Sequence, residues 1–410
     1  MSTLMLTAPR LRRGASRGQC AWNARSLDRR DHEGVSIRTV LVVGAGIAGS
    51  TVAGLLGRRG PEVTVVERSG GPRSSGSPVD VRGPALRVVE RMGLRPQLRA
   101  HATATTRLAA VNADGVVIGW IPTQRGPGAI EIPRADLAAI LTAAAHDHAE
   151  FRYDETITGL HDDGGAVRVR FASGTEGRFD LVIGADGLHS TVRRLAFGPE
   201  ERFATHLGLS IATLMFDVPA ADPGTVFIHS APGRAAIAHP TNGREGAALI
   251  FRPVRSTADA VRDPAARLDL LTATYRGMRW RVPEFLDRLR TADDVYFDDV
   301  SRIRVRHWSR GRTVLVGDAA GCVSLLGEGS SMAVAGAATL AAHLLYRPDD
   351  VAAACDGYQR AHRARLRPHL AGAAPAGHLL VPASRAGLAV RDVLFRTWAA
   401  TGGRSPGRRG

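Results

Sequence analysis

The amino-acid sequence predicts an α/β fold in which a domain built on a parallel sheet is interrupted by a mostly antiparallel sheet and followed by C-terminal helices. Two observations support this fold class. Residues 39–68 read as strand, glycine-rich turn, helix and second strand, the pattern of a parallel-sheet unit. Residues 207–251 contain several β-rich runs separated by Asp-Pro-Gly, Ala-Pro-Gly and Asn-Gly turns, which is typical of antiparallel strands. A chain of 410 residues can hold two or three such domains.

The first unit carries a glycine motif between its strand and its helix. Residues 40–43 form a short apolar run, as expected for a strand buried on both faces. Gly44, Gly46 and Gly49 then give the spacing G-x-G-x-x-G. The first glycine allows a tight turn, the second lets the backbone approach a pyrophosphate, and the third lets the helix pack closely on the strand. The sequence therefore predicts a phosphate-binding turn here.

The helix start and an acid complete this candidate site. Ile47 and Ala48 begin the helix, so their N–H groups and the helix dipole point toward the phosphates. Glu67, followed by Arg68, ends the second strand about 20 residues after the glycines. A carboxylate there accepts from a ribose 2′-OH and repels a 2′-phosphate, which predicts FAD or NAD as the tightly held nucleotide. An ordinary glycine-rich turn is the alternative, but the joint spacing favours a dinucleotide site.

Composition argues against several other classes of protein. The net charge is +15, yet every one of the 54 basic residues is arginine and much of the charge lies at the two ends of the chain, so nucleic acid is not the expected partner. Three cysteines, Cys20, Cys322 and Cys355, show neither a pairing pattern nor metal-ligand spacing, which favours a reducing cytoplasm and no metal site. No apolar run has the length of a membrane span, and no secretion signal begins the chain, so we expect no stable membrane insertion.

The other elements are expected in an order that alternates between the two domains. They are a helix over 84–92, strands over 106–121 around the 112–115 turn, a helix from Ile132 with Pro133 in its first turn, strands over 167–171 and 180–183, the strands of 207–251, helices near 264–276 and 283–291, strands over 301–305 and 312–316, helices over 329–346 and 351–366, and a basic amphipathic helix within 379–400.

Two further stretches carry recognisable chemistry. Asp186, Gly187, Ser190 and Arg193 follow a buried strand and give Asp-Gly-x-x-Ser-x-x-Arg. A later strand ends at Gly317-Asp318, and a glycine-rich loop with Gly327, Gly329 and Ser330 then opens a helix. Taken alone, Asp186 is an ordinary turn residue and Asp318 a helix cap.

Together with the glycine turn, these motifs resemble the single-component flavin-dependent monooxygenases of the p-hydroxybenzoate hydroxylase fold. The resemblance covers about residues 37–370, and natural-product tailoring and antibiotic-modifying members are the most similar. It implies a Rossmann-like FAD-binding domain and an inserted substrate domain. The expected division is a disordered basic tail over 1–36, an FAD-binding domain over 37–104, 134–204 and 301–372, a substrate domain over 105–133 and 205–300, and a C-terminal helix and tail over 373–410.

The resemblance also implies roles for single residues. Glu67 and Arg68 match the adenosine ribose end, and the glycine turn from Gly44 to Gly49 matches the pyrophosphate site. Arg134 matches the arginine that reaches the flavin phosphate or ribityl chain, and Asp318, after Gly317, the acid on the ribityl hydroxyls. The segment from Asp186 to Arg193 matches one that serves FAD and the visiting NADPH or NADH. The N–H groups from Gly327 to Ser331 suit negative charge on reduced flavin.

The implied reaction is oxygenation by a flavin C4a-hydroperoxide, formed from NADPH or NADH and O2, most simply hydroxylation of an aromatic or polyketide-like molecule. No side-chain nucleophile is required, so we assign no catalytic residue. His229, His239 and Leu325 are the candidate substrate residues, although a structural role is favoured for both histidines. Gly321 and Leu325 replace a histidine and a proline that the family usually carries, which leaves the shape of the oxygen pocket open.

Alternatives remain at this point. A flavin-dependent reductase of the geranylgeranyl-reductase type shares the fold and the first motif, and a degenerate flavoprotein that acts as a binding partner is the non-enzyme reading. For the helix within 379–400, packing on the rest of the protein is favoured over association with a membrane surface. Substrate identity, the type of oxygenation, NADH or NADPH preference, oligomeric state and whether residues 1–36 are translated stay undetermined by the sequence.

Overall fold

The computed structural model describes residues 37–71, 78–123, 126–241, 243–254, 257, 260–261, 263–292, 295–323 and 329–400. The predicted basic tail over residues 1–36 therefore lies outside the described residues, as do Leu325 and Gly327.

A six-stranded sheet with the order β17-β18-β11-β1-β2-β7 forms the core of the first domain. Its strands are β1 (Thr39–Val43), β2 (Glu62–Val66), β7 (Glu150–Arg152), β11 (Leu181–Gly184), β17 (Ser309–Arg310) and β18 (Thr313–Leu315). All its pairings are parallel except that of the edge strand β17. The sheet thus matches the predicted Rossmann-like unit, with β1 in the interior and buried from residue 40 to 43.

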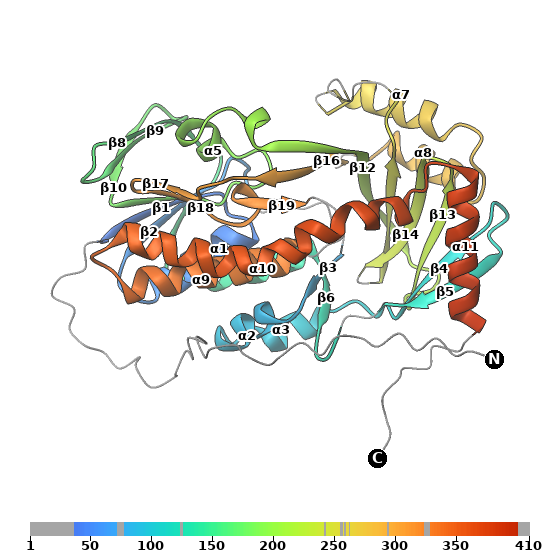
Figure 1. Cartoon of the computed structure of the whole chain (residues 1–410), viewed down its shortest axis with the longest axis horizontal. Coiled ribbons are helices and arrows are strands. Elements are labelled where there is room, and N and C mark those ends of the chain that lie inside the picture. The colour runs from blue at the N-terminus through green and yellow to red at the C-terminus, as the bar shows by residue number, and fades with distance from the viewer. Residues whose placement is uncertain are drawn as a thin grey trace, which may run out of the picture. The chain divides into compact units, whose positions relative to one another are not determined.

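Beside this sheet, α1 (Ile47–Gly57) packs against both α4 (Arg134–His146) and α9 (Gly329–Tyr346). A three-stranded sheet of β8 (Ile157–Asp162), β9 (Val167–Phe171) and β10 (Glu176–Phe179) lies on the other side, next to α5 (Thr191–Ala196) (Figure 1). Short elements complete this part: α2 (Pro84–Arg91), α3 (Arg95–Ala100), β3 (Pro78–Val81) paired with β6 (Ile130–Pro133), and the 3-10 helices η1 (Glu200–Arg202) and η2 (Gly317–Ala319).

A second, eight-stranded sheet has the strand order β19-β16-β12-β15-β14-β13-β4-β5. Its strands are β4 (Arg107–Val111), β5 (Val117–Pro122), β12 (Ala204–Pro219), β13 (Thr225–Ala231), β14 (Arg234–Thr241), β15 (Arg244–Phe251), β16 (Tyr296–Arg304) and β19 (Gly321–Val323). Every pairing is antiparallel except that of β13 with β4, so the predicted mostly antiparallel sheet is confirmed.

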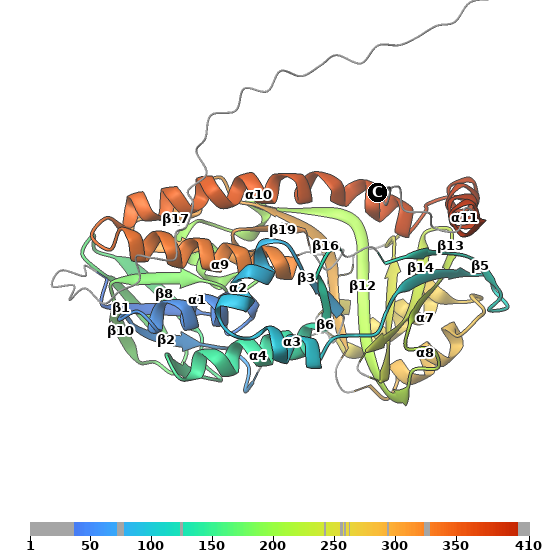
Figure 2. The same ribbon diagram turned by 90° about the horizontal axis from the view of Figure 1, so that it is seen from below.

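The two faces of this sheet are covered differently. One face packs on α7 (Pro264–Tyr275) and α8 (Val282–Leu289) through an apolar cluster that includes Phe251 and Phe285. The other face packs partly on the end of α10 (Val351–Leu380) and on α11 (Arg385–Ala400), through a cluster that includes Ile228, Ile250 and Phe395. Figure 2 shows α10 running from the first domain to the sheet and α11 at the far edge of the sheet.

Two expected boundaries were wrong. β16 begins at Tyr296, not near residue 301, because it continues along β12 as far as the pair of Tyr296 with Thr213. The helix expected to end near residue 366 extends to Leu380, so the expected domain boundary at 372 falls inside α10. Pro368 and Pro375 lie within it, which shows that packing against α9 and β19 overrides the local preference of proline to end a helix.

Among the described residues, no helix is both long enough and apolar enough to cross a bilayer.

Candidate functional site

The glycine turn has the geometry that its three glycines predict. Gly44 has φ +102°, and a Cβ there would lie 2.7 Å from the carbonyl oxygen of Ala185. A Cβ on Gly49 would lie 1.8 Å from the carbonyl oxygen of Gly44, so α1 packs directly on the turn. A Cβ on Gly46, in contrast, would have nothing within 4 Å. Open space over the middle glycine is what the approach of a pyrophosphate to the backbone requires.

Glu67 is held beside this turn by three hydrogen bonds. Its carboxylate accepts from the N–H of Ala45 at 3.0 Å and from the N–H and hydroxyl of Ser69 at 3.1 and 2.6 Å. Ile47 and Ala48 form the first turn of α1, whereas Arg68 points to solvent. The carboxylate is therefore fixed at the edge of the turn and only partly buried, as a ribose-binding acid must be.

Asp186 organises the loop after β11. It accepts hydrogen bonds from the hydroxyl of Ser190 at 2.5 Å and the N–H of Val192 at 3.0 Å, and Ser190 in turn caps α5 by accepting from the N–H of Arg193. Burial raises the pKa of Asp186, although these hydrogen bonds oppose the rise. Gly187 adopts φ +80°, which suits the tight turn. Asp186 thus shapes the loop through contacts inside the protein.

Arg193 connects two of the predicted motifs. Its side chain is fully buried and donates to the carbonyls of Leu188 at 2.6 Å and Ala319 at 3.3 Å, and to Glu200 at 2.7 Å. Because Ala319 follows Asp318 directly, Arg193 ties the loop after β11 to the loop after β18. Its position makes it a positioning residue for both loops.

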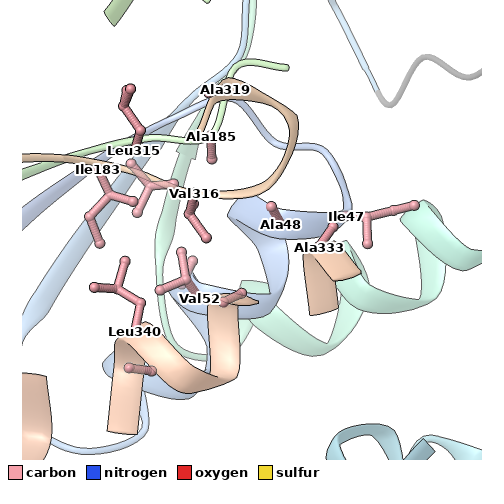
Figure 3. Close-up of a cluster of buried hydrophobic side chains, with 14 of the residues drawn as sticks. Ile47, Ala48, Val52, Ile183, Ala185, Leu315, Val316, Ala319, Ala333 and Leu340 are labelled. Carbon is pink, nitrogen blue, oxygen red and sulfur yellow. The ribbon is translucent and has the colours of Figure 1, made fainter. Parts of the chain in front are cut away.

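Asp318 lies where the starts of three helices meet. Gly317, at φ +65°, comes so close to α1 that a Cβ there would lie 2.8 Å from the Cβ of Ala48. A Cβ on Gly329, at the start of α9, would lie 3.6 Å from the Asp318 carboxylate. Figure 3 shows Ala48 on α1, Ala333 on α9 and Ala319 on the loop after β18 among the buried hydrophobic side chains of this region. Small residues allow this close convergence.

The chemistry around Asp318 is incomplete without a ligand. Burial raises its pKa, and the positive charge of Arg134, at the start of α4, offsets part of that rise. Within the described part of the chain, the buried hydroxyl of Ser330 lacks a hydrogen-bond partner. Buried polar groups normally have partners, so this hydroxyl, together with the carboxylate of Asp318, fits a cofactor with sugar hydroxyls and a polar ring edge.

One face of the eight-stranded sheet turns toward this convergence. Strand register places Tyr296 opposite Thr213, Thr213 opposite Ala248, and Ala248 opposite Ile237, so these residues share a face. Ile237 belongs to the same apolar cluster as Val323, which lies five residues after Asp318. The pKa of Tyr296 is raised by burial and is also influenced by the charges of Arg134 and Asp318. This face therefore meets the Asp318 region.

The two histidines named as substrate candidates lie on opposite faces of the sheet. His239 follows Ile237 by two residues and shares its face, with its Nε2 3.8 Å from the carboxylate of Glu131, three residues before Arg134. His229 lies on the other face, against Trp280, and its Nδ1 is 3.1 Å from the carbonyl oxygen of Val111. The geometry keeps His239 as a candidate and gives His229 a structural role.

A hydrogen-bonded network of charged side chains links this face of the sheet to the Asp186 loop, and it was not predicted from the sequence. Asp298 receives hydrogen bonds from Tyr296 at 3.2 Å and from His189 Nε2 at 3.0 Å, and His189 Nδ1 lies 2.8 Å from Glu200. His189 stands inside the Asp186 motif, and that was the only available signal, because Asp298 is 109 residues away in sequence. The network fastens the Asp186 loop to β16.

His189 makes this fastening dependent on pH. The hydrogen bond to Asp298 raises the pKa of His189 to about 9 against the opposing effect of burial, and Glu200 adds to the rise. A raised pKa means that the stabilisation is complete below the unfolded value of 6.5 and is lost as pH rises through about 9. We expect the melting temperature of His189→Gln to lie below that of the wild type at pH 6 and to converge with it above about pH 10.

The measurement is thermal unfolding of both proteins across that range, with His161→Gln, an exposed histidine of β8, as the control. A difference that stays constant with pH would contradict the assigned ion pair.

Comparison with known proteins agrees with the geometry. Residues 38–367 match the family model described as an FAD binding domain. An uncharacterised protein of Mycobacterium tuberculosis is 41% identical over 326 residues, which is 77% of this chain and 87% of that protein. A flavin-dependent monooxygenase of Legionella longbeachae is 32% identical over 74% of this chain and 80% of its own length.

Solved structures extend the comparison. The tetracycline destructase Tet(51) superposes with a TM-score of 0.76 at 26% identity, covering 91% of this chain and all of its own. Klebsiella pneumoniae HpxO, in complex with FAD and uric acid, superposes with a TM-score of 0.71 at 20% identity, over 88% of this chain and 93% of its own, which shows the shared fold. The chain belongs to the FAD-binding-domain family and is an FAD-dependent monooxygenase.

Proposed function

We propose that this monooxygenase hydroxylates a flat, largely apolar molecule that carries a ring hydroxyl, an aromatic or polyketide-like compound. The observation that carries this proposal is the sheet face next to Asp318, where apolar Ile211 and Ile237 lie beside two polar groups, His239 and Tyr296. An apolar floor with few polar groups suits a ring system that is oriented by its hydroxyl groups. Two solved relatives at 26% and 27% identity are tetracycline destructases, so tetracyclines are sensible first compounds to test.

The residues of the first domain fit FAD. When bound, FAD supplies the transfer of electrons from NADPH or NADH to O2 and thereby the oxygen chemistry. Glu67 would accept from the adenosine ribose, the open side of Gly46 would take the pyrophosphate, and Asp318 with Arg134 would take the ribityl chain and its phosphate. The N-terminus of α9, with Gly329 and Ser330, would offer N–H groups to the polar edge of the flavin.

The residues of the sheet would then place and enclose the substrate. Tyr296 holds its hydroxyl by donating to Asp298, so the phenol is oriented before a substrate arrives. His239, which lies on the same face of the sheet, and Glu131, three residues before Arg134, would receive a second polar group of the substrate. Ile211, Ile237 and the other apolar residues of this face exclude water from the reacting atoms. On this basis the segments 105–133 and 205–300 form the substrate domain.

Isotope labelling tests the proposal directly. Purified protein loaded with FAD is given NADPH, tetracycline and ¹⁸O2, and the products are analysed by mass spectrometry. A monooxygenase of this substrate class adds one ¹⁸O atom per product and consumes NADPH in proportion. Addition of two hydrogens without ¹⁸O would instead identify a reductase. NADPH oxidation that yields only hydrogen peroxide with tetracycline and with a panel of ring-hydroxylated aromatics would contradict the proposed substrate class.

A further inference from the structure

Helix α11 has two faces of different character. One face packs on the sheet: Arg391 is buried and donates to Ser230, and the buried Phe395 lies so close to β5 that a Cβ on Gly119 would be 2.6 Å from its carbonyl oxygen. This confirms the expected packing on the rest of the protein. The opposite face points to solvent and is apolar. It exposes Val390 (63%), Val393 (52%), Leu394 (51%) and, at its flank, Trp398 (41%).

The exposed apolar residues of α11 lie at the spacing of one helix face. Positions 390, 393 and 394 repeat at intervals of three and four, so their side chains form one continuous stripe along α11. Exposed apolar residues scattered singly need no explanation, but a stripe of this kind marks an interaction surface. The helix lies at the edge of the sheet in both views, away from the FAD-binding domain (Figures 1 and 2).

The charge around the stripe identifies the kind of surface that it fits. Arg385 and Arg396 are exposed on α11, and the sequence adds Arg404, Arg408 and Arg409 in the ten residues that follow the helix. The one acid after residue 378 is Asp392, and its charge is already matched by Arg391 at 2.7 Å. The sequence after residue 378 therefore holds five arginines without an acidic counterpart, and two of them, Arg385 and Arg396, are exposed on α11 beside the apolar stripe.

We propose that α11 docks this enzyme onto the surface of an anionic phospholipid bilayer, with the helix parallel to the membrane and its outward stripe in the headgroup region. Apolar burial and arginine contacts with anionic lipid act together in such interfacial helices, and tryptophan is favoured at that depth. Packing of Arg391 and Phe395 on the sheet is kept, because the opposite face makes the contact. The helix does not cross the bilayer.

The same charges argue against a second copy as the occupant of the stripe. Two α11 helices placed face to face would bring arginines of both copies together without acids to balance them, and like charges at an interface oppose association. The basic N-terminal segment of residues 1–36 is unsuitable for the same reason, since it carries seven arginines against three acids. An anionic bilayer supplies the missing negative charge.

Vesicle binding of the full-length protein tests this inference. We expect cosedimentation with vesicles of phosphatidylcholine and phosphatidylglycerol, weak binding to pure phosphatidylcholine, and loss of binding in high salt. The double variant Arg385→Gln/Arg396→Gln should lower the partition coefficient roughly 30-fold, because each arginine near an anionic membrane surface contributes about 1 kcal/mol to binding. Leu394→Glu should lower it more than about tenfold, because it places a charge in the apolar stripe.

Matched controls separate docking from misfolding and from dimerisation. Leu345→Glu makes the same change at an exposed leucine of α9 and should bind vesicles like the wild type. Retained FAD and an unchanged melting temperature show that the α11 variants are folded. Vesicle binding that ignores lipid charge, or that survives Leu394→Glu, would overturn the proposal. So would a wild-type dimer in light scattering that Leu394→Glu converts to a monomer, since the stripe would then be a contact between copies.

Discussion

Gly49→Ala is expected to destabilise the protein by more than about 3 kcal/mol and to abolish FAD binding. The added Cβ would lie 1.8 Å from the Gly44 carbonyl oxygen, and its second neighbour is the Gly44 carbonyl carbon at 3.0 Å. Both are backbone atoms that a rotamer change cannot move. Relief requires α1 to shift away from β1, and that shift would displace the Ala45 N–H from Glu67 and open the nucleotide site. Thermal unfolding and flavin absorbance after gel filtration measure the two effects.

Gly46→Ala is the matched variant, because the same methyl group enters the same motif at a position with nothing within 4 Å. Without FAD, its melting temperature should equal that of the wild type. Its FAD dissociation constant should rise by roughly tenfold or more, since the methyl group occupies the side from which the pyrophosphate approaches. Equal destabilisation of the two apo variants would contradict the division of roles within the turn, and unchanged FAD affinity in Gly46→Ala would contradict the site itself.

The glycine turn was predictable because its chemistry lies in a few neighbouring residues. The turn, helix start and terminal acid are set by spacing along 30 residues, and the loops at Asp186 and Asp318 follow buried strands in the same way. Parallel strands bring their carboxyl ends to one edge, so such local motifs meet in space without further information. That rule gave the correct fold class and cofactor.

The proposed substrate face was less predictable because it depends on pairings between distant segments. His229 and His239 look alike in sequence, and only the register of β13 and β14 places them on opposite faces. The hydrogen bond between His189 and Asp298 joins residues from two domains, and no periodic pattern in the sequence predicts it. The length of α10 was missed for a related reason, since tertiary packing keeps two prolines inside a helix that local propensity would end.

Asp318→Asn is expected to leave the apo protein at least as stable as the wild type and to weaken FAD binding roughly 10- to 100-fold. Burial raises the pKa of Asp318 above that of an unfolded aspartate, so at neutral pH the charged form costs stability, and the cost falls as pH decreases through the folded pKa. The amide removes this cost. It also removes the charge from the acceptor that would hold the ribityl hydroxyls, and hydrogen bonds to charged groups contribute about 1.5–3 kcal/mol.

Asp180→Asn provides the opposite signature and therefore the control. Asp180 accepts from the N–H groups of Arg38 and Thr39 at 2.7 and 2.9 Å, where it secures the start of β1 to β11. Its amide should lower the melting temperature while leaving the FAD affinity of the folded protein unchanged. Calorimetry of the apo proteins and fluorescence titration with FAD distinguish the two variants. If Asp318→Asn loses stability and keeps its FAD affinity, Asp318 is a structural residue, and the ribityl site lies elsewhere among the converging helix starts.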